Sequence, residues 1–309
     1  MYQIIKNSKI FISLSSVLVI LSIIAIAVFG LNFGVDFTGG SLLEIRFNGD
    51  VPNTGDIQEA LSPLNLSSLV LQPAGDDGLI LRFQETSEEK HHEIFTTIEG
   101  LVSVKTDDAS STEQIVSGIE ELRFDSVGPS IGKELKRKSI YSLILVIISI
   151  VIYIAWVFRR VSKPVESWKY GVVANIALFH DVIIVLGVFA VAGHYYGIEI
   201  NTPFVAAILT VLGYSVNDSI VVFDRIRENL PKSEDNFADT VNRSLNESIS
   251  RSLNTSITTM LVLLSVYFFG GYTLRPFILA LSIGVFIGTY SSIFLASPLL
   301  VVWDNIRRK

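Results

Sequence analysis

Six long apolar runs constrain this sequence more than any other feature, because each is long enough to cross a lipid bilayer as a helix. A hydrocarbon core about 30 Å thick requires roughly 20 residues at a rise of 1.5 Å each. A spanning segment must also pair its own backbone groups, which favours helices. The runs are residues 10–31, 140–158, 170–192, 202–223, 255–272 and 277–303. We therefore expect an α-helical polytopic membrane protein with six transmembrane helices.

The composition agrees with a membrane protein and excludes several other classes. Hydrophobic residues make up 50% of the chain and charged residues only 17%, whereas about a quarter of the residues in soluble domains are charged. The formal net charge of -6 argues against a nucleic-acid partner, because such proteins usually carry a basic surface. The chain has no cysteine, which excludes disulfides, thiolate metal sites and lipidation on cysteine.

The first apolar run has an alternative interpretation as a cleaved signal peptide. Lys6 and Lys9 precede it, and the small residues Ala25 and Ala27 resemble a cleavage site. The apolar run continues past these alanines to Leu31, which makes it too long for a typical signal peptide. We therefore expect this run to be retained as the first span.

The distribution of lysine and arginine predicts the orientation, because these residues collect in short cytoplasmic loops. An N-terminus in the cytoplasm leaves only Arg275 in the two short external loops. One basic cluster, at residues 133–138, departs from this pattern. The sequence therefore predicts that both termini are cytoplasmic. The basic residues on the predicted cytoplasmic side are Lys6, Lys9, Arg159, Arg160, Lys163, Lys169, Arg225, Arg227, Lys232, Arg243, Arg251, Arg307, Arg308 and Lys309.

A polar segment between the first two runs predicts a separate extracytoplasmic domain. Its hydrophobic pattern changes between period 2 and period 3.6, which indicates strands and helices in the order βαββαβ. That order is typical of an α+β ferredoxin-like domain. The predicted strands are 42–47, 69–71, 79–83 and 119–127, the predicted helices are 54–61 and 87–101, and 103–117 is a predicted loop or frayed helix.

The chain therefore divides into three predicted parts. Residues 1–33 form the cytoplasmic N-terminus and the first transmembrane helix, 34–139 the extracytoplasmic ferredoxin-like domain, and 140–309 the remaining five helices with their loops and the C-terminus. The charged stretch 225–251 has apolar residues at helical spacing, which predicts an amphipathic helix along the membrane surface.

Two adjacent histidines, His91 and His92, lie on the second predicted helix of this domain. Neighbouring residues on a helix point about 100° apart, and no other ligand frames the pair at metal-binding spacing. We therefore expect surface histidines, and we expect no metal or other cofactor.

Ionisable residues well inside the spans are the best candidates for a functional site. They are His180 and Asp181 in the third run and Asp218 in the fourth. An Asp at the centre of a membrane helix costs on the order of 3 kcal/mol, so such residues usually line a polar pathway. Arg251, at the entrance to the fifth run, is the candidate cation that reaches inward, and Asn217 adds an amide beside Asp218.

A purely structural role is the alternative for these residues. Asp181 and Asp218 would then only bond neighbouring helices, and for His180 and Asp181 this alternative stays open. Polar bonds between membrane helices contribute about 0.6 kcal/mol on average. That is too little to account for the carboxylate of Asp218, for which we therefore expect a further role.

Several motifs resemble the SecF family of the resistance-nodulation-division superfamily, and they extend from the first span to the last. A resemblance of this length and order is specific. The motifs are GVDFTGG at 34–40, VGPSIGKEL at 127–135, ALFHDV at 177–182, GYSVNDSIVVFDRIREN at 213–229, SLNTSITT at 252–259 and GTYSSIF at 288–294.

The resemblance implies a subunit that has no enzymatic activity and uses the proton-motive force to assist protein translocation across the bacterial cytoplasmic membrane. It implies SecD, the SecYEG channel, YajC, YidC and an unfolded preprotein as partners. In the family, the residues that match Asp218 and Arg251 are implicated in proton passage. Ser219 and Ser252 stand where threonine is usual, and both keep a hydroxyl.

Two other function classes are weaker alternatives. An intramembrane aspartyl protease also needs two carboxylates on neighbouring spans, which Asp181 and Asp218 provide, but the sequence lacks the motifs around them that such proteases have. A proton-driven small-molecule efflux transporter of the same superfamily usually has 12 spans and two large external segments. This chain has half that number of predicted spans and a single such segment.

Overall fold

The computed structural model describes all residues except 1, 85–86, 103–117, 159–165 and 308–309. It divides into two compact units, a helical unit of residues 1–32 and 139–309 and a sheet unit of residues 33–138. The loop or frayed helix predicted for 103–117 lies outside the described residues.

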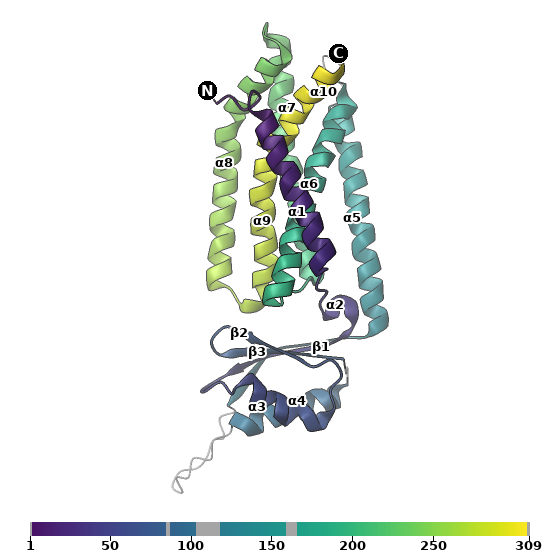
Figure 1. Ribbon diagram of the computed structural model, residues 1–309, viewed down its shortest axis with the longest axis vertical. Helices are drawn as coiled ribbons and strands as arrows, with labels where there is room; N and C mark the ends of the chain where they lie inside the picture. Colours follow the sequence, from purple (N-terminus) through teal and green to yellow (C-terminus); the bar gives the residue numbers. More distant parts are fainter. Residues whose placement is uncertain (1, 85–86, 103–117, 159–165, 308–309) are drawn as a thin grey trace. The chain divides into compact units, whose positions relative to one another are not determined.

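Six helices in the described residues are long and apolar enough to cross a membrane, which confirms the predicted number of spans. The last of them is interrupted by a turn of π-helix (Figure 1). The spans are α1 (Ser8–Phe29), α5 (Pro129–Val157), α6 (Ser167–Tyr196), α7 (Thr202–Asn229), α8 (Phe237–Phe269) and the series α9 (Arg275–Ser291), η4 (Ser292–Ala296) and α10 (Ser297–Arg307).

The helical unit is centred on α6, α7 and the last span, which bury at least half of their apolar windows, whereas α1, α5 and α8 leave most of theirs exposed. Glycine allows the central helices to approach closely. A Cβ on Gly284 of α9 would lie 2.1 Å from Val211 Cγ2 of α7, and a Cβ on Gly288 would lie 3.0 Å from Ser215 Cβ. These two glycines of the last span therefore pack against α7 within this chain.

The predicted surface helix at 225–251 is wrong. The α7 helix continues to Asn229, and α8 begins at Phe237 and continues without a break through Arg251. The reason is that no Gly or Pro interrupts the chain within α8. Its apolar residues Val241 and Leu245 are fully buried in the protein rather than turned to a membrane surface.

Polar contacts fasten the end of α7 to the start of α8. Arg225 Nε donates to Glu247 Oε2 at 2.6 Å, and Asn229 Nδ2 donates to the same oxygen at 2.8 Å. Asn229 Nδ2 also donates to Ser244 Oγ at 3.0 Å. These contacts join the two helices into an antiparallel pair.

The sheet unit contains four antiparallel strands in the order β2-β3-β1-β4, with β1 paired to both β3 and β4. A short helix that the sequence did not predict, α2, precedes the first strand. The element order βαββαβ is the predicted one and gives the split βαβ arrangement. The elements are α2 (Val35–Thr38), β1 (Gly40–Phe47), α3 (Thr54–Leu61), η1 (Ser62–Leu64), β2 (Val70–Ala74), β3 (Gly78–Phe83), α4 (Glu88–Val102) and β4 (Ile119–Val127).

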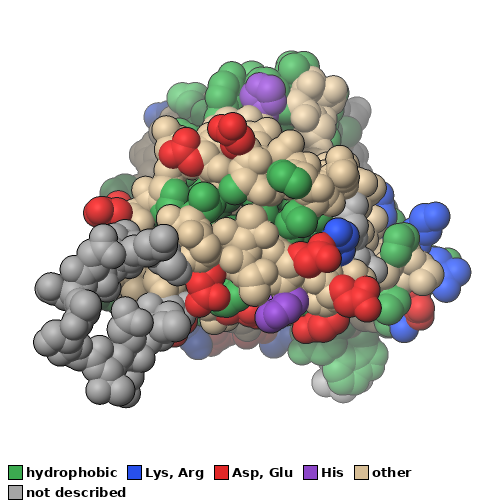
Figure 2. All heavy atoms as spheres, turned by 90° about the horizontal axis from the view of Figure 1, so that it is seen from below, with side chains coloured by type: hydrophobic (Ala, Val, Ile, Leu, Met, Phe, Trp, Pro, Cys, Tyr) green, Lys and Arg blue, Asp and Glu red, His purple; other side chains and the backbone are tan. Residues whose placement is uncertain are grey.

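One face of this sheet forms the core of the unit, because alternate strand residues point to the same side. Leu43 and Leu81 are paired neighbours on β1 and β3 and are fully buried. They join one apolar cluster with Ile57 of α3 and Ile94 of α4, so both helices cover the same face. Figure 2 shows more acidic than basic side chains on the surface seen from below.

Both edge strands of the sheet carry features that hinder pairing with another strand. The β2 strand contains Pro73, which has no backbone N–H to donate. In β4 the register shifts opposite Glu44 and Ile45, so that Leu122 bulges out of the ladder. Such features protect exposed sheet edges.

A pair of glycines, Gly39 and Gly40, connects α2 to β1 at positive φ angles of +80° and +123°. A Cβ on Gly40 would lie 2.7 Å from the Phe83 carbonyl oxygen, and one on Gly39 would lie 2.9 Å from Pro129 Cα. On the first turn of α5, a Cβ on Gly132 would lie 3.2 Å from the Gly39 nitrogen. Two motifs that are distant in sequence therefore meet here in backbone contact.

Candidate functional site

Asp181 on α6 carries a completely buried carboxyl group in the helical unit. His180 Nδ1 lies 2.9 Å from Asp181 Oδ1. Ser215 Oγ of α7 donates to Asp181 Oδ2 at 2.5 Å, and Ser291 Oγ of α9 donates to the same oxygen at 2.9 Å. Three helices therefore contribute partners to this one carboxylate.

Asp218 lies in the same interior on α7 and is also buried, with 8% of its surface exposed. Ser292 Oγ, the first residue of the π-turn, donates a short hydrogen bond to Asp218 Oδ2. The buried hydroxyl of Ser252 on α8 lies beside the same carboxyl group. The hydrogen bond from Ser292 to Asp218 thus comes from a serine hydroxyl of the last span.

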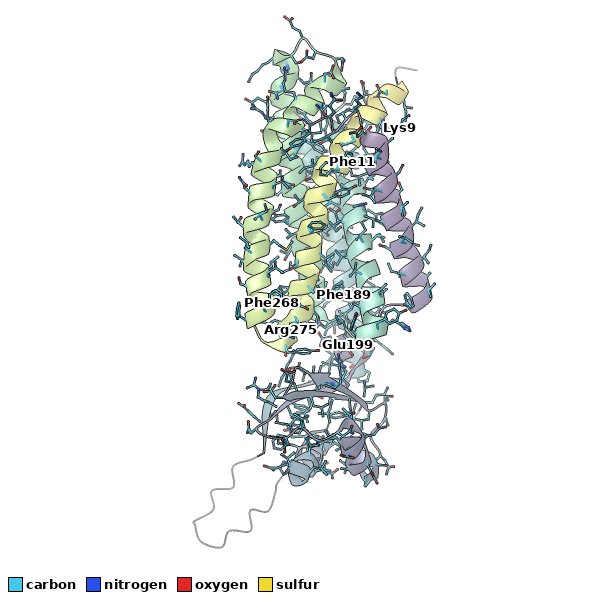
Figure 3. All side chains as sticks on the ribbon, turned by 60° about the vertical axis from the view of Figure 1, so that its left-hand side comes forward. Lys9, Phe11, Phe189, Glu199, Phe268 and Arg275 are labelled. Atoms are coloured by element: carbon cyan, nitrogen blue, oxygen red, sulfur yellow. The ribbon has the colours of Figure 1, made fainter. Side chains whose placement is uncertain are left out.

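A second set of hydrogen-bonded hydroxyl groups connects α7, α8 and α9. Tyr214 of α7 and Ser256 of α8 have their hydroxyl oxygens 3.0 Å apart, and Ser256 Oγ lies 2.5 Å from Thr289 Oγ1 of α9. Phe11 of α1, labelled in Figure 3, contacts Phe294 of the last span with ring centroids 4.6 Å apart. The α1 helix therefore packs against the span that carries Thr289.

The structure brings three of the five predicted site residues into this interior. His180 and Asp181 are in direct contact, and Asp218 is buried on the neighbouring helix. Asn217 on α7 and Arg251 on α8 are exposed instead. Their side chains lie on the outside of the helical unit, although Arg251 directly precedes the buried Ser252.

Sequence reasoning missed Ser291 and Ser292 as partners of the two carboxylates. Both are fully buried. The signals in the sequence were a pair of adjacent hydroxyl residues within the last apolar run and their place in the motif at 288–294. Serines are common in membrane helices, so these signals could not have distinguished a carboxylate partner from an ordinary packing residue.

No group of three or more potential metal-ligating side chains that could hold a metal ion occurs in the described residues. The buried cluster offers carboxylates, hydroxyls and one imidazole, which are groups that bind and release protons or exchange hydrogen bonds. The cluster therefore contains groups that are chemically able to exchange protons.

Comparison with known proteins identifies the family. Residues 108–306 match the model of the C-terminal part of the protein export membrane proteins SecD and SecF, and residues 24–51 match the SecD/SecF GG motif. The protein translocase subunit SecF of Thermobaculum terrenum is 40% identical over 99% of this chain and 95% of its own length. The chain belongs to the SecF family. SecF of Desulfurispirillum indicum is 39% identical over 94% of this chain and 88% of its own length.

Solved structures of SecDF share the fold. The crystal structure of SecDF from Thermus thermophilus, described as a translocon-associated membrane protein, has a TM-score of 0.81 and 32% identity over 98% of this chain. SecDF in a super-membrane-facing form has a TM-score of 0.66, again at 32% identity. This SecF-family chain spans 39% of the length of either SecDF chain. Gly39 and Gly40 lie in the matched GG motif, and the buried cluster lies in the matched C-terminal part.

Proposed function

We propose that this chain is the SecF subunit of an accessory complex that assists protein translocation by using the proton-motive force. The relatives are named protein translocase subunits, and the similar solved structures are of SecDF, which is more than twice as long as this chain. We infer that SecD supplies the missing part. The complex then acts beside the SecYEG channel, with YajC and YidC as further partners and an unfolded preprotein as its client.

The observation that carries the proton-coupled part of this proposal is the buried carboxyl group of Asp218. A carboxylate within a membrane-spanning helix is costly and usually functional. In our proposal Asp218 takes up a proton from one side of the membrane and releases it to the other. Arg251 and Asn217 are exposed, and in our proposal they act where the proton enters this route. The buried pair His180 and Asp181 lies within the same polar interior as Asp218.

The proton-motive force is large enough for this purpose. One elementary charge that crosses 100 mV supplies about 2.3 kcal/mol. That energy shifts the equilibrium between two conformations by roughly fiftyfold. We propose that this shift rocks the helices against those of SecD and moves the sheet unit against the emerging polypeptide.

The proposed setting is the cytoplasmic membrane of a bacterium. Lysine and arginine residues are concentrated in the segments that contain the two termini and in the loops on the same side. By the positive-inside rule, we propose that both termini are cytoplasmic. The sheet unit then lies on the extracytoplasmic side, where a translocated chain emerges.

Replacement of Asp218 by Asn tests the proton-coupled function. Vesicles that contain the channel, SecD and this chain should lose the stimulation of preprotein translocation by a proton gradient. Asp224→Asn is a matched control on the same helix, because Asp224 is exposed and its Oδ1 pairs with Arg227 at 2.6 Å. This control should keep the stimulation. Full stimulation in the Asp218→Asn vesicles would contradict the proposal.

A further inference from the structure

Two consecutive serines, at the junction between α9 and the π-turn of the last span, bond to two different carboxylates. Ser291 Oγ donates to Asp181 Oδ2 on α6 at 2.9 Å, whereas Ser292 Oγ donates to Asp218 Oδ2 on α7. Successive residues of a helix point about 100° apart, so neighbours can reach different helices. Both serines are fully buried. One turn of one helix is therefore bonded to both carboxylates at the same time.

The irregular geometry of this turn is local. The π-helix covers Ser292–Ala296, between the regular helices α9 and α10. One turn earlier, Gly288 lets α9 approach α7 so closely that an added Cβ would lie 3.0 Å from Ser215 Cβ. Single π-turns within α-helices occur frequently at functional sites. This turn lies at the level of the two carboxylates, where a functional irregularity would be expected.

The two carboxylates differ in how firmly they are held. Asp181 is completely buried and has three partners, namely His180, Ser215 and Ser291. Asp218 keeps a small exposed fraction of 8%, and the hydroxyls at its carboxyl group are those of Ser292 and Ser252. A carboxylate surrounded by donors is stabilised as a fixed acceptor. Asp181 is thus the better anchor, and Asp218 is the better site for exchange.

The Ser292 hydroxyl also has a second acceptor within reach. Its Oγ lies 3.0 Å from the carbonyl oxygen of Thr289, in addition to its contact with Asp218. A hydroxyl can donate one hydrogen bond while it accepts others. It can therefore donate to Asp218 when that carboxyl is ionised. When Asp218 carries a proton, the hydroxyl can turn its hydrogen to Thr289 and accept the new O–H of Asp218.

We infer that Ser292 is a positioning residue for proton exchange at Asp218, and that Ser291, held by Asp181 and His180, anchors the π-turn that presents it. This inference rests on the proposed proton uptake by Asp218. The proton arrives at and leaves from a carboxyl oxygen of Asp218 in this scheme, and Ser292 only exchanges the direction of its hydrogen bond. Asp181 keeps its partners throughout and holds the turn in place.

Infrared difference spectroscopy of the reconstituted complex, recorded on acidification, tests this inference directly. The C=O band of protonated Asp218 is assigned by its loss in Asp218→Asn. Because a hydrogen bond lowers the frequency of a C=O stretch, Ser292→Ala should move this band or change its shape, and Ser292→Thr should restore it. Ser282→Ala is the matched control, since Ser282 is on the same span and its Oγ has no hydrogen-bond partner within the described residues. This control should leave the band unchanged.

Translocation measured on the same variants separates the inference from the proposed function. Ser292→Ala should lower the rate that depends on the proton gradient by about tenfold, as expected for a lost hydrogen bond to a charged group. Ser291→Ala should also lower this rate, because the hydrogen bond from Ser291 to Asp181 that anchors the π-turn is lost. If Asp218→Asn abolishes the stimulation while Ser292→Ala changes neither the band nor the rate, the positioning role is refuted and the proposed function stands. If Asp218→Asn keeps the stimulation, both are refuted.

Discussion

Asn246 on α8 binds the backbone of Tyr2, which lies 244 positions earlier in the chain: its Oδ1 accepts from the Tyr2 N–H at 2.6 Å, and its Nδ2 donates to the Tyr2 carbonyl oxygen at 2.9 Å. One turn earlier on the same helix, Asn242 Oδ1 accepts from the Ile5 N–H at 3.2 Å. The side chain of Ile4 between them is buried. Two asparagine side chains of α8 therefore hold the backbone of the segment before α1 by hydrogen bonds.

Replacement of the Asn242 and Asn246 side chains should release the N-terminal segment from α8. Each hydrogen bond contributes about 1 kcal/mol, so local opening should become roughly fivefold more frequent per lost bond. Hydrogen exchange of the Tyr2–Ile5 amides should accelerate in Asn242→Ala and Asn246→Ala. Asn254→Ala, an exposed position on the same helix, should leave the exchange unchanged. Unchanged exchange in all three variants would contradict this fastening.

A side chain at Gly40 should destabilise the sheet unit. The positive φ of +123° and the Phe83 carbonyl oxygen, which would lie 2.7 Å from an added Cβ, both oppose it. We expect Gly40→Ala to lower the free energy of unfolding by about 1–3 kcal/mol. The matched control is Gly49→Ala, where nothing lies within 4 Å of an added Cβ. Chemical denaturation of the full chain in detergent, followed by hydrogen exchange in β1, measures the difference. Equal stability of the two variants would show that the close approach at Gly40 does not constrain the turn.

A methyl group at Gly284 should loosen the contact between α7 and α9. It would lie 2.1 Å from Val211 Cγ2 and 2.9 Å from Val211 Cβ. Overpacking of this kind costs about 1–3 kcal/mol, so thermal unfolding in detergent should occur at a lower temperature. The double variant Gly284→Ala with Val211→Ala should recover part of the loss, because the second change removes the clashing atoms. Gly213→Ala, on an open face of α7, should behave like the unaltered chain. A Gly284→Ala chain as stable as that control would contradict the predicted clash.

The two adjacent histidines of the sheet unit should differ in their contribution to stability. The ring of His91 stacks on Phe124 with centroids 3.9 Å apart, and its Nε2 lies 3.0 Å from Glu121 Oε2. Its side chain is 14% exposed and therefore lies only partly at the surface, whereas His92 is exposed, as expected. We expect His91→Ala to cost about 1–2 kcal/mol and His92→Ala to cost little. Hydrogen exchange of β4 amides in the full chain compares them, and equal protection in both variants would count against this contact.

Local periodicity was sufficient to predict most elements of this fold. The helix at Thr54–Leu61 and the strand at Ile119–Val127 have the predicted bounds, because the alternation of apolar residues reports directly which face is buried. The spans were predicted for a similar reason, since bilayer thickness fixes their minimum length. Neither prediction required knowledge of contacts between distant residues.

Features that depend on contacts between helices could not be predicted in this way. The exposure of Arg251, the continuity of α8 and the pairing of Ser292 with Asp218 all follow from how the helices pack. The close approach of Gly288 to Ser215 and the π-turn that follows it are likewise specified by no local pattern. The buried acids were recognisable because charge within an apolar run is rare, but their partners were ordinary serines.

The protection of both edge strands, β2 and β4, has a specific consequence for a sheet that lies near unfolded chains. An extended polypeptide is a natural seed for cross-strand aggregation, and any open ladder of backbone groups would capture it. Pro73 on one side and the bulge at Leu122 on the other deny it a continuous template. An extended polypeptide beside this sheet unit therefore finds no continuous edge on which to add a strand.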